Sequence, residues 1–234
     1  MGKRKLGVGM TVQFDKFDRG ARPVRFIPNR HRPGLYRNFF KRVFDTLFIL
    51  VTLPFTFLLI AILAAMVAVD GGKPLYRSPR VGRKGTVFGM LKLRTMIPDS
   101  DAVLKQHLAE NSAARIEWER TQKLKDDPRV TKLGKVLRKT SLDELPQLWN
   151  VLVGDMSLVG PRPMLKEQEP LYPGIAYYSL RPGMTGSWQV NSRNESEFCR
   201  RSEYDQDYDK ELSLKTDIKL LIRTVGVVLR GTGY

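Results

Sequence analysis

The sequence predicts an α+β fold that is mainly helical and is attached to a membrane by an amino-terminal re-entrant helix-hairpin. Three observations support this prediction: a 24-residue apolar segment, Thr46–Val69, which contains a proline; short strand-like stretches confined to the part that follows; and helical patterns, some amphipathic and interfacial in character, over much of the remainder. The 234 residues and their 42% hydrophobic content suit one domain, or at most two.

Positive charge is concentrated near the amino terminus. The net charge is +16, and residues 1–42, with 12 basic and 2 acidic side chains, carry +10 of it. We therefore predict a basic, disordered arm over residues 1–37, of the kind that binds anionic lipid or nucleic acid. The single cysteine, Cys199, excludes an intramolecular disulfide framework, and two histidines argue against a His-rich zinc site.

The membrane anchor is predicted over residues 38–72. A straight helix over 46–69 would be roughly 36 Å long, enough to span a bilayer core of about 30 Å. Both flanks are basic, however, so the positive-inside rule places both in the cytoplasm. Pro54 bends or breaks the helix into legs of roughly 12 and 22 Å, neither of which spans alone. A re-entrant hairpin satisfies both observations, and a proline-kinked spanning helix is the alternative.

The remaining residues, 73–234, are predicted to form a cytoplasmic domain. The expected elements are strands at 75–76 and 86–88 about a turn at 81–85, and helices at 99–125, 142–153 and 217–229. The last helix is amphipathic, and could pack in the core or lie on a membrane surface with its cations snorkelling. Lys92 and Arg94 alternate as on a strand and would share a face, which could be functional or simply solvated.

Two adjacent carboxylates, Asp143 and Glu144, are the strongest chemical signal. They lie near a predicted helix amino end, where the helix dipole favours their ionised forms. An ionised Asp can act as a nucleophile toward phosphorus or as a ligand to Mg²⁺. The structural alternative is a capping box, because Ser141 and Glu144 have the S-x-x-E spacing, although Pro146 weakens it.

Cationic side chains surround this pair in the sequence. Arg138 and Lys139 precede it, and Arg162 follows between two prolines, a setting that pre-organises a guanidinium for bidentate phosphate contact. An ordinary surface role for Arg162 is the alternative. Neither a P-loop nor a G-x-G-x-x-G motif is present, which argues against a Walker-type nucleotide site.

Several ordered motifs over residues 38–234 resemble the bacterial sugar transferases, the monotopic phosphoglycosyl transferases of polysaccharide assembly. They are KRVFD before the proline-broken apolar segment, then YRSPRVGRKGTVF, LKLRTM, KLKDDPRVTKLGKVLRKTSLDELPQLWNVLVGDMSLVGPRP, RPGMTGSWQVNSR and SLKTDIKLLIRTVGVVLRGTGY. One departure is Thr52-Leu53-Pro54, where many members have Ser-Pro, and it leaves the depth and angle of the hairpin open.

The resemblance implies a membrane-associated catalytic core that transfers a hexose-1-phosphate from a UDP-hexose to undecaprenyl phosphate, a polyprenyl phosphate. UMP would be released and exopolysaccharide repeat-unit synthesis initiated, with galactose or glucose as the sugar. In the implied mechanism Asp143 forms a covalent phosphosugar intermediate, Glu144 assists, and both bind Mg²⁺, with Mn²⁺ as an alternative. The implied phosphate-binding residues are Lys92, Arg138, Arg162 and Pro163, and Asp217 is implied in donor or metal handling.

The resemblance also implies a location in the bacterial inner (cytoplasmic) membrane, with the catalytic domain facing the cytoplasm. Anionic lipids are expected partners, a homo-oligomer is compatible with the sequence, and no nucleic acid is expected. The alternative from charge alone is a non-catalytic, membrane-tethered protein that binds anionic lipid or nucleic acid. That alternative leaves the carboxylate pair and the loop around Arg162 without a role.

Overall fold

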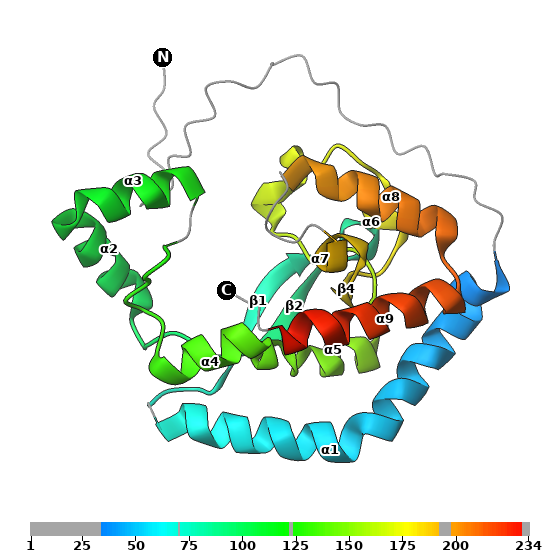
Figure 1. The fold of residues 1–234 in the computed structure, drawn as a ribbon, viewed down its shortest axis with the longest axis horizontal. Helices are drawn as coiled ribbons and strands as arrows, with labels where there is room; N and C mark the ends of the chain where they lie inside the picture. The colour runs from blue at the N-terminus through cyan, green and yellow to red at the C-terminus, as the bar shows by residue number, and fades with distance from the viewer. Residues whose placement is uncertain (1–33, 70, 122–123, 192–197, 231–234) are drawn as a thin grey trace.

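The computed structural model describes residues 34–69, 71–121, 124–191 and 198–230. The predicted basic arm, 1–37, therefore lies outside the described residues except for its last four positions. The described part comprises a long bent helix, α1, and a domain that lies against it, with a pair of helices projecting from one side of that domain (Figure 1). As expected, helices predominate and the strands are few and short.

Helix α1 spans Lys41–Val69 and continues a π-helical turn at Tyr36–Phe40. It does not divide at Pro54, which lies inside it; instead the helix bends, and its blue and cyan limbs diverge in Figure 1. Proline removes one backbone donor, which explains the bend. Two threonines near Pro54 donate to preceding carbonyls, Thr52 to Phe48 O at 2.9 Å and Thr56 to Thr52 O at 3.0 Å.

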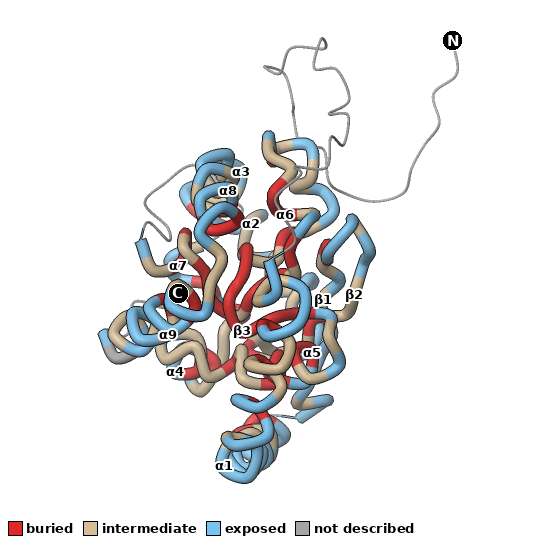
Figure 2. Tube along the Cα trace, turned by 90° about the vertical axis from the view of Figure 1, so that its right-hand side faces the viewer, coloured by how far each residue is buried: buried red, intermediate tan, exposed pale blue. Residues whose placement is uncertain are grey.

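Both ends of α1 pack against the domain. Near its start, Asp45 is 1% exposed and accepts hydrogen bonds from Ser157 Oγ (2.7 Å) and from the N–H of Leu158 (3.2 Å). Near its end, Leu63 and Val67 are buried in a cluster with domain side chains. Between them no residue from 50 to 62 is buried, and Figure 2 shows α1 as a mostly exposed tube below the domain.

Two small sheets organise the domain. Strands β1 (Leu75–Val81) and β2 (Val87–Leu93) form an antiparallel hairpin, longer than predicted, about the expected glycine-bearing turn. Strands β3 (Ser157–Val159) and β4 (Gly183–Thr185) pair in parallel, which the sequence analysis did not anticipate. All three residues of β3 are buried, so the second sheet lies in the core.

The helix expected over 99–125 is in fact two helices, α2 (Ser100–Glu110) and α3 (Ser112–Thr121). The break is at Asn111, whose backbone is extended and whose side-chain oxygen accepts the N–H of Ala114 at 3.0 Å. An Asn that caps the following helix in this way competes with helix continuation. In Figure 1 this pair projects to one side of the domain.

The other helices are α4 (Lys132–Thr140), α5 (Gln147–Val153), α6 (Ala176–Ser179), α7 (Ser187–Asn191), α8 (Arg201–Glu211) and α9 (Leu214–Leu229). Helix α9 agrees with the amphipathic helix expected from 217, and Ile218, Ile222 and Val225 are exposed on it. Its apolar residues are therefore only partly in the core. Helices α4, α5 and α9 lie in the layer nearest α1, and α8 lies on the far side of the domain (Figures 1 and 2).

Candidate active site

The carboxylate pair lies in a tight connection between α4 and α5. Helix α4 ends at Ser141, which is left-handed (φ 58°), and a 3-10 turn, Leu142–Glu144, follows before α5 begins after Pro146. Ser141 makes no side-chain capping bond, so the capping-box alternative is wrong, as is a single helix over 142–153. The pair nevertheless lies just before the amino end of a helix, as predicted.

Lys92 connects the hairpin to this pair. Its Nζ lies 2.8 Å from Glu144 Oε1 and 3.6 Å from Asp143 Oδ2. Asp143 is 8% exposed, and burial raises the pKa of its carboxyl group; the charge of Lys92 opposes that shift and the charge of Glu144 adds to it. Asp143 is therefore a buried carboxyl group, and the neighbouring ammonium group of Lys92 stabilises its ionised form.

Arg162 reaches the same pair from a loop fixed by close backbone packing. The N–H of Gly183 donates to Pro161 O at 2.8 Å, and the N–H of Gly160 donates to Thr185 O at 2.8 Å. A Cβ on Gly183 would lie only 2.1 Å from Gly160 N, so only glycine fits there. The guanidinium of Arg162 lies 3.6 Å from Glu144 Oε1 and its side chain is 35% exposed.

Arg138 and Arg94, the other arginines considered, face different partners. Arg138 Nε donates to Thr95 Oγ1 at 3.0 Å, and the charge of Arg138, like that of Lys92, opposes the rise in the pKa of Asp143. Arg94 lies beyond the end of β2 and donates to Val67 O at 2.8 Å, at the end of α1. Lys92 and Arg94 therefore contact different parts of the molecule, and the interpretation of Lys92 as merely solvated is wrong.

A cavity of about 220 Å³ opens beside Glu144. Arg162 and Pro163, both predicted to bind phosphate, line it together with two arginines that the sequence did not single out, Arg80 of β1 and Arg201 of α8. Its other lining residues are Met90, Lys92, Gln147, Leu165, Gln168, Gly183 and Met184.

The hairpin register could have revealed Arg80. Tyr76 faces Lys92 and Arg80 faces Phe88, so Arg80 and Lys92 project from the same face of the hairpin. Arg201 had no such signal, because it follows a segment without a recognisable motif and begins a helix with little apolar periodicity.

Asp217 lies apart from the carboxylate pair. It is fully buried and accepts three hydrogen bonds, from Tyr36 OH (2.7 Å), Lys41 Nζ (2.7 Å) and Tyr208 OH (2.6 Å). Lys41 belongs to α1, so Asp217 joins the start of that helix to α9. The structure thus places Asp217 in a structural cluster, away from the cavity.

The pair fits a hard divalent cation that also binds substrate. Within the described ranges, no group of three or more His, Cys, Asp or Glu side chains could hold a metal alone. Mg²⁺ commonly binds one or two protein carboxylates and completes its shell with substrate phosphates and water. Asp143 and Glu144 beside a cationic cavity provide such a partial set.

Comparison with known proteins gave consistent matches. The family model for bacterial sugar transferases matches residues 36–231. A UDP-galactose-lipid carrier transferase of Erwinia amylovora is 47% identical over 197 residues, which are 83% of this chain and 41% of that protein. An undecaprenyl-phosphate galactose phosphotransferase of Salmonella typhimurium matches with the same identity and coverage. The exopolysaccharide production protein ExoY of Sinorhizobium fredii is 42% identical over 196 residues, which are 82% of this chain and 87% of that protein.

Proposed function

The chain belongs to the bacterial sugar transferase family, and we propose on that basis that it transfers a hexose-1-phosphate from a UDP-hexose to undecaprenyl phosphate. UMP is the second product, and the lipid-linked sugar begins an exopolysaccharide repeat unit. The names of the relatives support a galactose or lipid-carrier substrate and a role in exopolysaccharide production. The chain spans 41% of the length of the Erwinia and Salmonella relatives, so the substrates named for those proteins are proposals for this chain.

One observation carries the proposal: Asp143 is buried beside Lys92, and Lys92 and the adjacent Glu144 line a cavity together with three arginines. In the first step an oxygen of the Asp143 carboxylate bonds to the hexose-bearing phosphorus, and the bond from that phosphorus to the bridging oxygen breaks. UMP leaves with the electron pair, and an acyl phosphate remains on Asp143.

In the second step the polyprenyl phosphate oxygen attacks the same phosphorus. The Asp143–phosphorus bond breaks, and the carboxylate is regenerated. The buried position of Asp143 supports its role, because burial weakens solvation of the carboxylate while Lys92 keeps the anion accessible. The anion would then be poised to react once a phosphate displaces the ammonium contact.

Mg²⁺, with Mn²⁺ as an alternative, would be held by Asp143 and Glu144 together with the donor phosphates. When bound, it would neutralise phosphate charge and polarise the phosphorus–oxygen bonds. Lys92 and Arg162 contribute fixed positive charge on the same side of the pair, at 2.8 and 3.6 Å from Glu144 Oε1. These side chains orient Glu144 and attract a polyphosphate before any reaction occurs.

We also propose that α1 enters the membrane and returns on the same side. Its two ends pack on one domain, through Asp45 at the start and through Leu63 and Val67 near the end, while its apolar middle, residues 50–62, has no buried residue. A spanning helix would place its ends on opposite faces of the bilayer, which would separate one end from the domain. The bend at Pro54 lets the middle dip into lipid.

Exposed apolar side chains on the neighbouring helices extend this surface. They are Val136 of α4, Trp149 and Val153 of α5, and Ile218, Ile222 and Val225 of α9. We propose that these helices lie in the interface, next to anionic lipids, on the cytoplasmic face of the inner membrane. Basic residues on both flanks of the apolar segment support the cytoplasmic side.

The topology can be tested with single cysteines at Asn38 and Lys73 in a Cys199→Ser background. We expect neither position to react with a membrane-impermeant thiol reagent on intact cells, and both to react once the membrane is opened. Labelling of one position alone on intact cells would mean that α1 spans. Pro54→Leu should straighten the helix and give a mixed topology, because the basic flanks oppose inversion.

The activity can be tested with the purified full chain, Mg²⁺, undecaprenyl phosphate and a panel of UDP-hexoses. We expect UMP release and a lipid-linked product with at least one of these sugars, and neither with Asp143→Asn. A non-catalytic lipid- or nucleic-acid-binding protein would release no UMP with any sugar. Such a result, from protein that melts cooperatively, would refute the transferase function.

A further inference from the structure

Cations predominate among the charged residues that line the cavity beside Glu144. Arg80, Lys92, Arg162 and Arg201 all line it. Lys92 contacts both carboxylates and Arg162 contacts Glu144, but among the described residues no ion pair joins Arg80 or Arg201 to a carboxylate. Among the residues that line the cavity these four cations face one carboxylate, Glu144, while Asp205 and Glu167 act electrostatically on Arg201 and Arg80 from outside the lining.

The three arginines repel one another in the free protein. Burial lowers the pKa of Arg201 to about 10, and the positive charge of Arg162 contributes to that shift. The pKa of Arg80 is also lowered, mainly by burial and in part by Arg162. Like charges that converge on a cavity destabilise each other until an anion binds between them.

The guanidinium of Arg201 packs against two aromatic rings, but one of its N–H groups has no acceptor in the described part of the chain. Its guanidinium carbon lies 4.0 Å from the centre of the Trp188 ring and 4.4 Å from that of Phe198. Its Nε is buried and has no hydrogen-bond partner in the described part of the chain. A buried N–H without an acceptor is costly, so its retention beside a cavity points to an acceptor supplied by a ligand.

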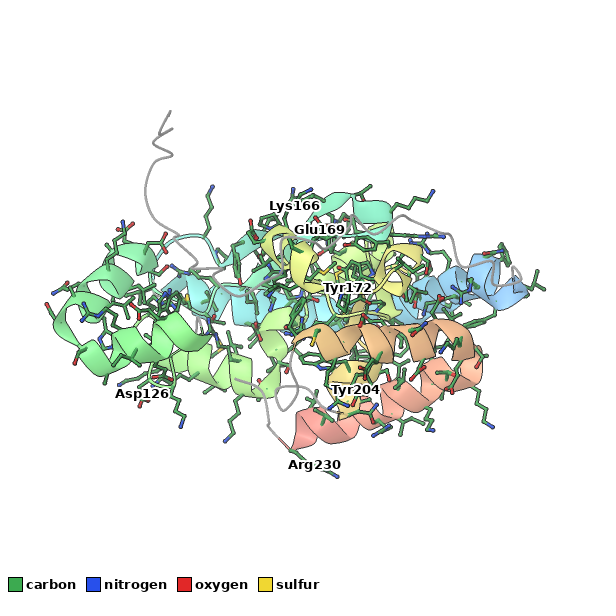
Figure 3. The ribbon with its side chains drawn as sticks, turned by 90° about the horizontal axis from the view of Figure 1, so that it is seen from above. Asp126, Lys166, Glu169, Tyr172, Tyr204 and Arg230 are labelled. Atoms are coloured by element: carbon green, nitrogen blue, oxygen red, sulfur yellow. The ribbon has the colours of Figure 1, made fainter. Side chains whose placement is uncertain are left out.

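Arg201 lies on the side of the domain away from the membrane helix. Arg201 begins α8, which Figures 1 and 2 show on the opposite side of the domain from α1. In Figure 3, Lys166 and Glu169, which follow the Arg162 loop, lie on the hairpin side, with Arg230 at the end of α9 on the other. Asp143, by contrast, belongs to the connection between α4 and α5, in the layer nearest α1.

We propose that Arg80, Arg162 and Arg201 form the subsite for the leaving nucleoside monophosphate, with Arg201 as the residue that fixes its phosphate. This inference rests on the proposed transferase function. The water-soluble donor would place its nucleotide phosphate at the arginine end and its sugar-linked phosphate next to Asp143. The lipid acceptor would approach Asp143 from the side of α1.

The arrangement suits the charge change of the first step. When Asp143 bonds to the sugar-linked phosphorus, the bridging oxygen keeps the electrons of the broken bond, so the nucleotide phosphate gains one negative charge. Guanidinium groups fixed at that phosphate stabilise the departing anion more than the bound donor. They should therefore bind UMP well and make it a competitive inhibitor against the donor.

The direct test is UMP binding to Asp143→Asn protein in lipid nanodiscs, with and without Arg201→Gln. We expect Arg201→Gln to raise the Kd for UMP about ten- to hundred-fold, the effect of losing one charged hydrogen bond. Uridine, which has no phosphate, should bind equally to both proteins. Arg201→Lys, which keeps the charge but loses the planar fork, should weaken UMP binding less.

Two further variants control for misfolding and for general charge. Arg200→Gln removes an adjacent arginine whose side chain is 59% exposed, and should leave UMP binding unchanged. Arg80→Gln removes a subsite arginine from a different element, and should weaken UMP binding even if Arg201→Gln melts at a lower temperature. Unchanged UMP binding in folded Arg80→Gln and Arg201→Gln proteins would overturn the subsite.

Kinetics in the otherwise wild-type enzyme separate the donor from the acceptor. Arg201→Gln should slow the chemical step that forms UMP and raise the KM for UDP-hexose, while the KM for undecaprenyl phosphate stays the same. A rise in the acceptor KM alone would mean that the arginines bind the lipid phosphate, contrary to the inference. Arg201-dependent UMP binding by a protein that transfers no sugar would refute the transferase function but support the subsite.

Discussion

Asp217→Asn tests whether the buried cluster between α1 and α9 holds the membrane helix on the domain. The substitution keeps the shape of the side chain but removes its charge. Lys41, whose Nζ lies 2.7 Å from Asp217 Oδ2 and whose side chain is only 9% exposed, is then left as a buried cation without its carboxylate. Removing one partner of a buried ion pair costs about 3–5 kcal/mol.

That loss corresponds to a large shift in melting temperature. For a domain of about 150–250 residues, 1 kcal/mol shifts Tm by about 2–4 °C, so we expect a decrease between about 6 and 20 °C. The three tryptophans of the chain provide an intrinsic fluorescence signal for melting in detergent or nanodiscs. Lys41→Met added to Asp217→Asn should recover part of the loss, because it removes the unpaired charge.

The matched control is Asp207→Asn, the same substitution in an exposed ion pair with Lys210. Exposed pairs contribute little, so its Tm should stay close to that of the wild type. An Asp217→Asn protein that melts like this control would refute the structural role. If that protein also lost sugar transfer, the earlier hypothesis that Asp217 handles donor or metal would be favoured instead.

Four further predictions concern the candidate active site. Gly183→Ala should lower kcat/KM at least tenfold, because its Cβ would displace the Arg162 loop. The control is Gly226→Ala, whose Cβ would lie in open space on α9. An unchanged rate in Gly183→Ala would contradict the role of the loop. Transfer should decline as pH falls through the raised pKa of Asp143, since only the anion is nucleophilic. Because the pKa of Asp143 is raised in the folded protein, this carboxyl group stabilises the fold most at low pH and loses that contribution as pH rises through the raised pKa. Asp143→Asn should therefore melt at or above the wild-type temperature at neutral pH. A clear loss of stability would argue against this. Exhaustive EDTA treatment should abolish transfer, and Mg²⁺ or Mn²⁺ should restore it; full activity after EDTA would exclude a metal role.

The sequence analysis predicted the local features well. The β1–β2 hairpin and the proline inside the apolar helix followed from short sequence patterns. A role for Lys92 beside Asp143 and Glu144 was implied by the family resemblance alone, and the structure places Lys92 and Arg162 in contact with Glu144. The helix predicted over 142–153 was wrong at its start, because a 3-10 turn occupies Leu142–Glu144 and α5 begins only after Pro146.

The features that were missed depend on long-range packing. Helix α8 buries Asp205, Tyr208 and Asp209 in place of an apolar stripe, so hydrophobic periodicity could not reveal it. Asp217 obtains its partner Lys41 from 176 residues away, which no local spacing encodes. The parallel pairing of β3 with β4 likewise joins two three-residue strands that are too short to be recognised individually.

The central claim, that Asp143 carries the sugar phosphate, is tested most directly by mass spectrometry of the enzyme after incubation with UDP-hexose and Mg²⁺ without acceptor. We predict one hexose-phosphate adduct on the peptide that contains Asp143, lost on addition of undecaprenyl phosphate and absent from Asp143→Asn. An adduct on another residue, or sustained sugar transfer by Asp143→Asn, would contradict the claim.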